Sequence, residues 1–404
     1  MQIHRFVHAA WLTLAALDAS AAERLQITVQ HDLQAARPNE TIAIPWAEVV
    51  RRLPGAQMLQ LQVRDSNGTL LPYQVSNVPP LTQDASDEAP DADLAHGELL
   101  FQHDFALHEQ RASFSVEKSS TPVLPFPAKT FARYVPERLD DFAWENDRLG
   151  HRTYGPALAA PAPPGSAKEV LVTSGIDIWF KRVPYPIVDR WYSKGHYHQD
   201  DGEGLDMYSV GRTRGAGGTG IWDGRQLFVS RNYASWRVIA NGPIRSVFEL
   251  SYAPWNAGGV AVSEVKRFTV DAGHLFDTVD STFTTEQPQS LQVAIGLNKN
   301  PAYAEQTPSA ASYRSPEALM QWVDQRSAGN FGTAIILPGA SGQAADTDNE
   351  LILAKVTSGK PLRYHLGAAI NWSGAIPNAQ AWQAYVQAYR QRLASPVRIE
   401  LSTE

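Results

Sequence analysis

Residues 191–206, WYSKGHYHQDDGEGLD, combine most of the side chains that enzymes use to move protons: histidine, tyrosine, lysine and carboxylates. If residues 191–200 are extended, successive side chains point to opposite faces. One face then carries Tyr192, Lys194, His196, His198 and Asp200. A face of this composition does not suit an apolar core, and so many proton-transfer groups fit an ordinary solvated surface poorly. We therefore expect a functional site on this face rather than an exposed strand edge.

Three kinds of chemistry compete for this face. In the first, acid–base catalysis without a metal, His196 or His198 is the base and Tyr192 is the acid. Lys194 then neutralises a carboxylate of the substrate. The second is a divalent metal site at His196 and His198, completed by Asp200, Asp201 or Asp206, although the DDGEGLD spacing departs from the EF-hand loop. The third is a sugar-binding face without activity; we favour the first and expect no cofactor.

Residues 142–155, FAWENDRLGHRTYG, form a second polar and aromatic run. A guanidinium can clamp a carboxylate through two parallel hydrogen bonds, so we expect Arg148 and Arg152 to contact an acidic substrate. The alternative for both arginines is an ion pair with a neighbouring carboxylate. Trp144 presents a flat ring that suits the face of a sugar, although large aromatic residues are more often core.

Further predicted substrate contacts follow the histidine pair in the chain. They are Asp200, Asp201, Arg212 and Trp222. The glycines of residues 211–220, GRTRGAGGTG, do not stand at a strand-to-helix junction, so they indicate tight turns rather than a nucleotide cradle. Arg212 and Arg214 beside these turns could clamp a substrate carboxylate or pair within the protein.

The elements that must position these residues are mostly strands. Early in the chain, short runs of β-forming residues alternate with turn signals such as Asn67-Gly68. The same rhythm resumes on a larger scale after a proline-rich segment. We therefore predict an N-terminal β-sandwich over residues 22–118, a linker over residues 119–130 and a larger β domain over residues 131–404.

One helix is expected near the C-terminus. Within AQAWQAYVQAYRQRLASP, apolar and aromatic residues recur every three or four positions. They are Trp382, Tyr385, Val386, Tyr389 and Leu393. Asn378 is placed to cap the start of this helix, and Pro396 to stop it. The predicted fold class is mainly β, with one amphipathic helix packed against the sheets.

Composition narrows the function classes. The net charge of −7 and the pI near 5.9 argue against a nucleic-acid partner, which needs a basic surface. The chain has no cysteine, which excludes thiol catalysis and thiolate metal sites. Residues 1–21 contain an apolar run followed by Ala19-Ser20-Ala21, which is typical of a secretory signal peptide and predicts a periplasmic or secreted protein. No stretch is long and apolar enough for a transmembrane helix.

Three segments resemble a family of secreted bacterial proteins catalogued as a domain of unknown function. They are FARYVPERLDDFAWENDRLGHRTYGPAL, DRWYSKGHYHQDDGEGLDMYSVGRTRGAGGTGIW, and YHLGAAINWSG with the terminal AWQAYVQAYRQRLASP. The resemblance covers essentially the whole chain after the signal peptide and implies a galactose-mutarotase-like β-supersandwich. It also implies a carbohydrate function, because members tend to occur beside enzymes that degrade uronic-acid polysaccharides such as pectins and ulvan. Members often carry a cysteine in the GxGG turn; this chain has Ala216 there, so a thiol role is excluded.

The leading hypothesis is a lyase that acts on uronate-containing oligosaccharides by β-elimination or dehydration. Such a reaction needs a cation to neutralise the substrate carboxylate, a base, and an acid for the leaving oxygen. A glycoside hydrolase is an alternative, whose two carboxylates could come from Asp200, Asp201, Glu203 and Asp206. A sugar epimerase or mutarotase and a periplasmic carbohydrate-binding protein without activity also remain open. In each case the expected partner is an oligosaccharide or polysaccharide, not a nucleic acid or a membrane.

Overall fold

The computed structural model describes residues 24–81, 94–302, 309–325 and 328–403. The predicted signal peptide, residues 1–21, lies outside these ranges. The described chain is mainly β, as the sequence patterns predict, and its strands form five sheets. None of the helices in the described ranges has the length and hydrophobicity that a membrane span requires.

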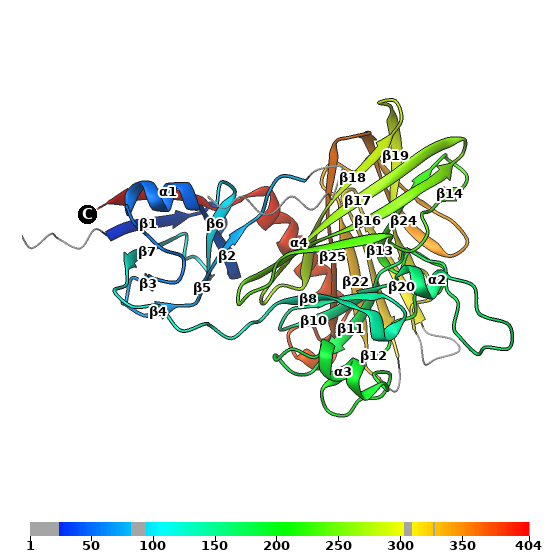
Figure 1. The fold of residues 1–404 in the computed structure, drawn as a ribbon, viewed down its shortest axis with the longest axis horizontal. Coiled ribbons are helices and arrows are strands. Elements are labelled where there is room, and N and C mark those ends of the chain that lie inside the picture. The colour runs from blue at the N-terminus through cyan, green and yellow to red at the C-terminus, as the bar shows by residue number, and fades with distance from the viewer. Residues whose placement is uncertain (1–23, 82–93, 303–308, 326–327, 404) are drawn as a thin grey trace, which may run out of the picture.

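Two small sheets pack against each other near the N-terminus and form a sandwich (Figure 1). The first, in the order β26-β1-β7-β3-β4, consists of β1 (Arg24–Gln30), β3 (Leu61–Asp65), β4 (Leu70–Leu71), β7 (Arg111–Lys118) and β26 (Arg398–Thr403). The second, in the order β2-β6-β5, consists of β2 (Arg37–Pro45), β5 (Tyr73–Asn77) and β6 (Gly97–Phe105), and the helix α1 (Trp46–Arg52) follows β2. Alternate side chains such as Leu25, Ile27 and Val29 fill the shared core, as expected for strands.

The last strand of the chain belongs to this N-terminal sandwich. β26 runs antiparallel to β1, with Leu401 opposite Ile27. The final strand of the predicted larger domain, residues 131–404, therefore lies in the smaller sandwich. Residues 119–130, the predicted linker, contain no helix or strand. The two parts of the molecule are thus joined through this segment and again near the C-terminus.

The larger part is built on an eight-stranded antiparallel sheet, in the order β15-β16-β17-β18-β25-β22-β21-β20. Its strands are β15 (Ser235–Ala240), β16 (Arg245–Ala257), β17 (Val260–Asp271), β18 (Phe276–Thr285), β20 (Ser309–Ser315), β21 (Ala318–Asp324), β22 (Phe331–Ile336) and β25 (Pro361–Ile370). A second sheet packs on one face of it, in the order β14-β13-β19-β24-β23. This sheet consists of β13 (Ala216–Trp222), β14 (Leu227–Phe228), β19 (Ser290–Asn298), β23 (Gly342–Ala345) and β24 (Asn349–Thr357).

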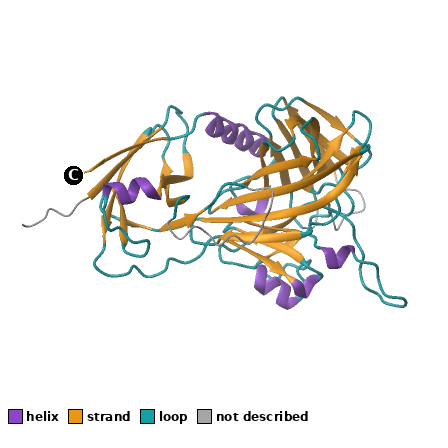
Figure 2. Ribbon diagram, turned by 45° about the horizontal axis from the view of Figure 1, so that its top comes forward, coloured by secondary structure: helices purple, strands orange, loops and turns teal. Residues whose placement is uncertain are grey.

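The helix α4 (Ala379–Ala394) covers the opposite face of the eight-stranded sheet and lies beside the small sandwich (Figure 2). The Tyr364 hydroxyl donates to Gly217 of the second sheet, whereas the next residue, His365, faces Tyr389 of the helix. The Asn378 side chain accepts a hydrogen bond from the backbone of Ala381 at 2.9 Å and caps the helix as predicted. The predicted C-terminal helix is confirmed.

The third large-domain sheet, in the order β12-β11-β10-β9-β8, carries the candidate site. Its strands are β8 (Phe131–Val135), β9 (Asp141–Glu145), β10 (Leu149–Thr153), β11 (Asp177–Lys181) and β12 (Gly204–Asp206). The antiparallel pairing places Arg152 opposite Asp177, and Trp179 opposite Asp206. Because side chains alternate along each strand, one face is apolar and packs into the main core. The other face carries Asp141, Glu145, Arg152, Asp177, Lys181 and Asp206 around Trp179, and is called the charged face below.

Candidate functional site

The segment predicted as a strand begins with a helix that covers the charged face. Residues 188–194 form α3 (Val188–Lys194), so the predicted common face is wrong. That face comprised Tyr192, Lys194, His196, His198 and Asp200. Val188, Trp191 and Tyr192 recur at helical spacing and are buried. Gly195 then ends the helix in a left-handed conformation, φ 71°, which glycine adopts without a steric penalty.

Two of the predicted catalytic residues lie in a surface ion network. The Lys194 ammonium is 3.1 Å from Glu203 Oε2. The His196 Nε2 atom is 3.1 Å from Asp201 Oδ2, and both of these side chains are about half exposed. Lys194 and His196 are therefore engaged with carboxylates near the surface of the loop.

The other two, Tyr192 and His198, lie at the charged face. Tyr192 is buried, and its hydroxyl donates to Asp141 Oδ2 at 3.1 Å. His198 follows the helix and its Nδ1 atom faces Asp206. The His198 side chain is 36% exposed, so a ligand can reach it. Of the four predicted catalytic residues, His198 is therefore the one that joins the buried charges to the surface.

Arg152 is the centre of the charged face. Its side chain is buried and lies within ion-pair distance of three aspartates. The Nε atom is 2.7 Å from Asp177, Nη2 is 3.0 Å from Asp206, and Nη1 is 3.5 Å from Asp141. Contrary to the prediction, Arg152 is placed to organise carboxylates of the protein rather than to clamp one from a substrate.

The three aspartates around Arg152 hold protons more tightly than ordinary carboxylates. Burial raises the pKa of Asp141 to about 6, against the opposing effect of the Arg152 charge. Burial also raises the pKa of Asp177, and raises the pKa of Asp206 well above its usual range. Three carboxylates share one buried guanidinium here, so the cluster can retain a proton near neutral pH and exchange it with a neighbouring group.

Tyr197 connects this cluster to the surface. Its ring stacks on Trp179 with centroids 5.1 Å apart. Its hydroxyl oxygen accepts hydrogen bonds from Arg152 Nη1 at 3.0 Å and from Arg138 Nε at 3.2 Å. Because both lone pairs of the phenol oxygen are then occupied, the phenol proton is the group that Tyr197 can donate. The His198 ring lies next to it, with centroids 4.8 Å apart.

His198 and Tyr197 have complementary proton-transfer properties. Burial lowers the pKa of His198, so the imidazole is neutral near pH 7 and can accept a proton. Tyr197 presents a phenol that can donate one. A neutral imidazole beside a phenol that accepts from two guanidinium groups is an arrangement that can serve general acid–base catalysis.

The opposite end of the charged face is built on a second buried ion pair. Lys181 Nζ donates to Glu145 Oε2 at 2.6 Å and to the carbonyl oxygen of Asn146 at 2.7 Å. Burial lowers the pKa of Lys181. Glu145 also accepts the backbone N–H groups of Ile187 and Val188, which lie at the start of α3. Glu145 therefore fixes both the lysine and the helix that covers the sheet.

A cleft of about 360 Å³ opens at this end. It is lined by Asp147, Arg148, Lys181, Arg182, Val183, Pro184, Trp372 and Ser373. The predicted substrate contact Arg148 is thus in a cavity. Arg182 lies over the Trp372 ring, with its guanidinium carbon 3.6 Å from the centroid. Cations and an aromatic ring together are a setting in which an acidic sugar can bind.

Three other predicted substrate contacts lie away from this cleft and from His198. Trp144 is fully buried and its indole N–H donates to Asp277 at 2.8 Å, so it packs the core instead of facing a sugar. Trp222 is in a separate apolar cluster of the second sheet. Arg212 is exposed beside the glycine turns, whereas Arg214 is buried and donates to Ser174.

The two predicted aspartate contacts shape the loop that carries His198. Asp200 Oδ2 is 2.6 Å from Arg182 Nε. Its other oxygen accepts the backbone N–H groups of Gly202 and Gly204. Asp201 pairs with His196, as described above. Asp200 thus ties the histidine loop to the wall of the cleft.

Several residues of the site were not predicted. They are Arg138, Asp141, Asp177, Lys181, Tyr197 and Trp372. Two short strands, DFAWE and DIWFK, carried a usable signal, because each has charged residues four positions apart and hence on one face. Arg138 ends the short 3-10 helix η1 (Pro136–Arg138), and Trp372 lies in a second one, η2 (Asn371–Ser373). No periodic pattern in the sequence indicates either residue.

The predicted alternative of a metal at His196 and His198 finds no matching geometry. In the described ranges, no group of three or more histidine, aspartate or glutamate side chains is arranged to hold a metal ion. The two imidazoles are engaged with different carboxylates, Asp201 and Asp206.

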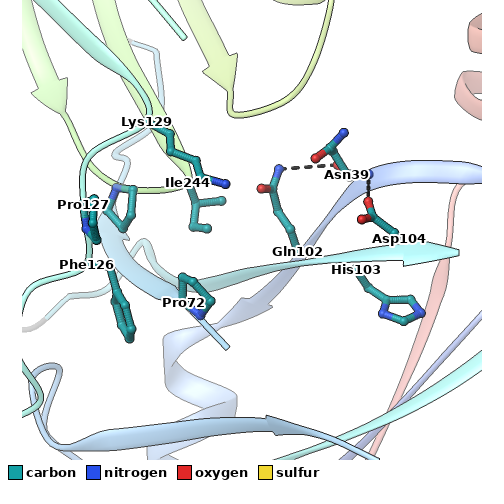
Figure 3. Close-up of a pocket in the computed structure, with 10 residues that line it drawn as sticks. Asn39, Pro72, Gln102, His103, Asp104, Phe126, Pro127, Lys129 and Ile244 are labelled. Carbon is teal, nitrogen blue, oxygen red and sulfur yellow. Dashed lines mark hydrogen bonds between the residues drawn. The ribbon is translucent and has the colours of Figure 1, made fainter. Parts of the chain in front are cut away.

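A separate cavity of about 240 Å³ lies where the small sandwich meets the larger part. Figure 3 shows Gln102 and Asp104 pointing from one side of β6 toward Asn39, while His103 points away. The Asp104 side chain accepts the Asn39 N–H at 2.6 Å, and Gln102 donates to the Ala272 carbonyl at 2.8 Å. The Gln102 hydrogen bond joins the two parts of the molecule, whereas the Asp104 bond lies within the small sandwich. None of the predicted site residues lines this cavity.

A family model, a related sequence and two solved structures each match nearly the whole chain. The family model described as "Domain of unknown function (DUF4861)" matches residues 29–399. The chain is 29% identical over 412 residues to "Uncharacterized protein P7" of Formosa agariphila, covering 98% of each. It is similar in structure to an alpha-mannosidase from Enterococcus faecalis V583, with 8% identity, a TM-score of 0.48 and coverage of 94% of this chain and 46% of that one. A glycosyl hydrolase family 38 protein from Enterococcus faecalis matches with 9% identity, a TM-score of 0.45 and coverage of 94% and 47%. The chain spans just under half the length of these two structures.

Proposed function

We propose that this chain, which belongs to the DUF4861 family, is a carbohydrate-active lyase for uronate-containing oligosaccharides. The proposed reaction is β-elimination or dehydration next to the substrate carboxylate. The observation that carries the proposal is the pairing of His198 with Tyr197 at the exposed edge of the charged face. The predicted signal peptide supports a periplasmic or secreted location as part of the same proposal.

His198 is the proposed base. A proton on the carbon next to a carboxylate is acidic enough to be removed by an imidazole when the developing charge is stabilised. Asp206 holds Nδ1, so Nε2 is the atom that takes the proton. This role replaces the prediction that left His196 and His198 as equal choices.

Tyr197 is the proposed acid, in place of Tyr192. As the carbon–hydrogen electrons form the new double bond, the carbon–oxygen bond breaks and the leaving oxygen takes the phenol proton. The leaving group is an alcohol in β-elimination and water in dehydration. Arg152 and Arg138 donate to the Tyr197 oxygen and stabilise the negative charge that remains on it.

Arg138 is the proposed partner of the substrate carboxylate at this point. Its side chain is 25% exposed, and its Nε donates to the Tyr197 hydroxyl. Its Nη2 is 2.6 Å from the exposed Glu169, which a substrate carboxylate would displace. Arg152 cannot take this role, because its exposed fraction is only 6%. A guanidinium beside the carboxylate withdraws charge from the carbon that loses its proton.

The hydrolase alternative is less well supported by the geometry. A hydrolase needs one protonated and one ionised carboxyl group on either side of a glycosidic bond. Asp200 is held by Arg182, and Glu203 by Arg190 and Lys194. Arginine hydrogen bonding holds the pKa of Glu203 low, at about 2, which does not suit a general acid.

Product analysis tests the proposal. The protein is incubated with saturated and with unsaturated uronate oligosaccharides, and the products are followed by mass and by the ultraviolet absorbance of a conjugated uronate. Chain cleavage with new absorbance indicates β-elimination, and loss of one water without cleavage indicates dehydration. Cleavage with gain of water would show a hydrolase. An unchanged mass and absorbance with every substrate would contradict a lyase and favour epimerisation or binding alone.

A further inference from the structure

The cleft at the lysine end of the charged face is assembled from three separate segments. The turn between β9 and β10 contributes Arg148, the end of β11 contributes Lys181 and Arg182, and the 3-10 turn η2 (Asn371–Ser373) contributes Trp372. The turn is held in place by Asn146, whose side-chain oxygen accepts the backbone N–H of Arg148 at 2.8 Å. The amide of Asn146 donates to two carbonyl groups of the 271–274 turn. The backbone that presents Arg148 is therefore fixed before any ligand arrives.

Arg148 differs from the other arginines of the site because its charge is not compensated by an ion pair. Its side chain is half-buried and lines the cleft. Across the described part of the chain, no carboxylate lies within ion-pair distance of this guanidinium, whereas Arg152 contacts three and Arg182 contacts Asp200. A half-buried guanidinium without a carboxylate is costly unless an anion from outside completes it.

The charges lining the cleft favour an anion. Three of the lining side chains are cations and one, Asp147, is a carboxylate. The Asp147 Oδ1 atom accepts a hydrogen bond from the backbone N–H of Gly273 at 2.5 Å. Lys181 is bound to Glu145 beneath the floor, so Arg148 and Arg182 are the groups that can contact a ligand. Two guanidinium groups suit the planar or trigonal oxygens of a carboxylate or sulfate.

The aromatic wall indicates that the anion is carried by a sugar. Arg182 stacks on Trp372 and is also held by Asp200, so the guanidinium and the ring form one rigid surface. Flat aromatic and guanidinium surfaces pack against the carbon–hydrogen faces of pyranose rings. A small inorganic anion would use only the charges, whereas an acidic sugar uses both the charges and the ring.

We propose that this cleft is a subsite for the anionic group, carboxylate or sulfate, of a sugar residue remote from the reacting bond. Asp177 and Lys181 are four residues apart on β11, which puts the two ends of the charged face about 13 Å apart. That separation exceeds one sugar ring, so a ligand that reaches both ends is an oligosaccharide. The inference rests on the proposed function only for the class of ligand, because binding at this cleft does not require turnover.

The test is binding of three monosaccharides that differ in the group at C6: a carboxylate, a sulfate ester or a neutral hydroxymethyl. Glucuronate, glucose 6-sulfate and glucose are titrated into the His198→Ala variant by calorimetry, so that catalysis does not interfere. Arg148→Gln is then compared in this background with the matched control Arg398→Gln, whose arginine pairs with Asp32 in the small sandwich. Folding of each variant is checked by thermal unfolding. Tryptophan fluorescence is also followed during each titration. If the fluorescence change on sugar binding comes from Trp372, the Trp372→Phe variant loses that change.

We expect glucuronate or glucose 6-sulfate to bind measurably more tightly than glucose. The one that binds more tightly shows whether the cleft prefers a carboxylate or a sulfate. Arg148→Gln weakens that binding about tenfold to a hundredfold, the range expected for a charge-assisted bidentate contact, and Arg398→Gln leaves it unchanged. Equal affinity for the three sugars, absence of binding, or equal loss in the two arginine variants would overturn it. Because His198 is already absent, these outcomes are independent of whether the lyase reaction occurs.

Discussion

The Nδ1 atom of His198 lies 3.1 Å from the carbonyl oxygen of Asp206 and 3.4 Å from that residue's carboxylate. A carbonyl oxygen can only accept a hydrogen bond, so Nδ1 carries the proton and Nε2 of the neutral ring is the basic atom. Asp206 thus selects the tautomer that the proposed proton abstraction needs. The same aspartate contacts Arg152, which connects the base to the buried cluster.

His198 and His196 form a matched pair for mutagenesis. Replacing His198 with alanine removes the proposed base, and kcat on a uronate oligosaccharide is expected to fall about 10²–10⁴-fold. His196→Ala removes a partly exposed pair with Asp201 and should leave kcat close to that of the parent protein. Steady-state kinetics of both variants make the comparison. Similar losses in the two would argue that neither histidine is the base.

Tyr197 and Tyr192 separate catalysis from stability. Tyr197→Phe removes the phenol proton and is expected to lower kcat about 10²-fold or more. Tyr192→Phe removes the donor to the buried Asp141 and should instead lower the free energy of unfolding by about 1–3 kcal/mol, with kcat of the folded protein retained. Urea denaturation and kinetics on both variants distinguish these effects. A normal kcat in Tyr197→Phe would exclude this residue as the acid.

Arg152 is expected to be a major determinant of stability. Arg152→Met leaves three buried aspartates without their cation and should lower the free energy of unfolding by about 3–5 kcal/mol. The control Arg398→Met removes an exposed pair and should leave the free energy of unfolding close to that of the parent protein. Both values come from urea denaturation. Equal changes in the two variants would show that the cluster does not depend on its guanidinium.

Asp141 makes stability depend on pH in an unusual direction. Its pKa is about 6 in the folded protein and about 3.8 in the unfolded chain, so the folded state holds the proton more tightly. The contribution of this group is therefore complete below pH 4 and is lost as the pH rises through about 6, a difference of about 3 kcal/mol. Asp141→Asn removes the titration. The free energy of unfolding of the parent protein minus that of this variant should decrease as the pH rises from about 4 to about 7. A difference that does not change with pH would contradict the raised pKa of Asp141.

The fold class could be predicted from local patterns because they have clear periods. Strand alternation, the Asn378 cap and the aromatic stripe of α4 all act over a few residues, and each matched the structure. The pairing of β26 with β1 could not be predicted in this way. This pairing joins strands at the two ends of the described chain. The sequence of neither strand indicates which other strand it pairs with.

The site was only partly predictable for a related reason. Trp191 and Tyr192 fit both a strand and a helix, and the helix forms because Val188 and both rings can be buried together on one side. That the segment forms a functional site stays a prediction, and the extended common face expected for it is wrong. The cluster around Arg152 depends on the register of four strands, which no single segment specifies.

The most direct test of the account is a kinetic isotope effect. A saturated uronate oligosaccharide carrying deuterium on the carbon next to its carboxylate is compared with the ordinary substrate, and the reaction is followed by absorbance and mass. Abstraction of that proton by His198 predicts slower turnover of the deuterated substrate, and near loss of turnover in His198→Ala. Equal rates for the two substrates with product cleaved by addition of water would contradict proton abstraction.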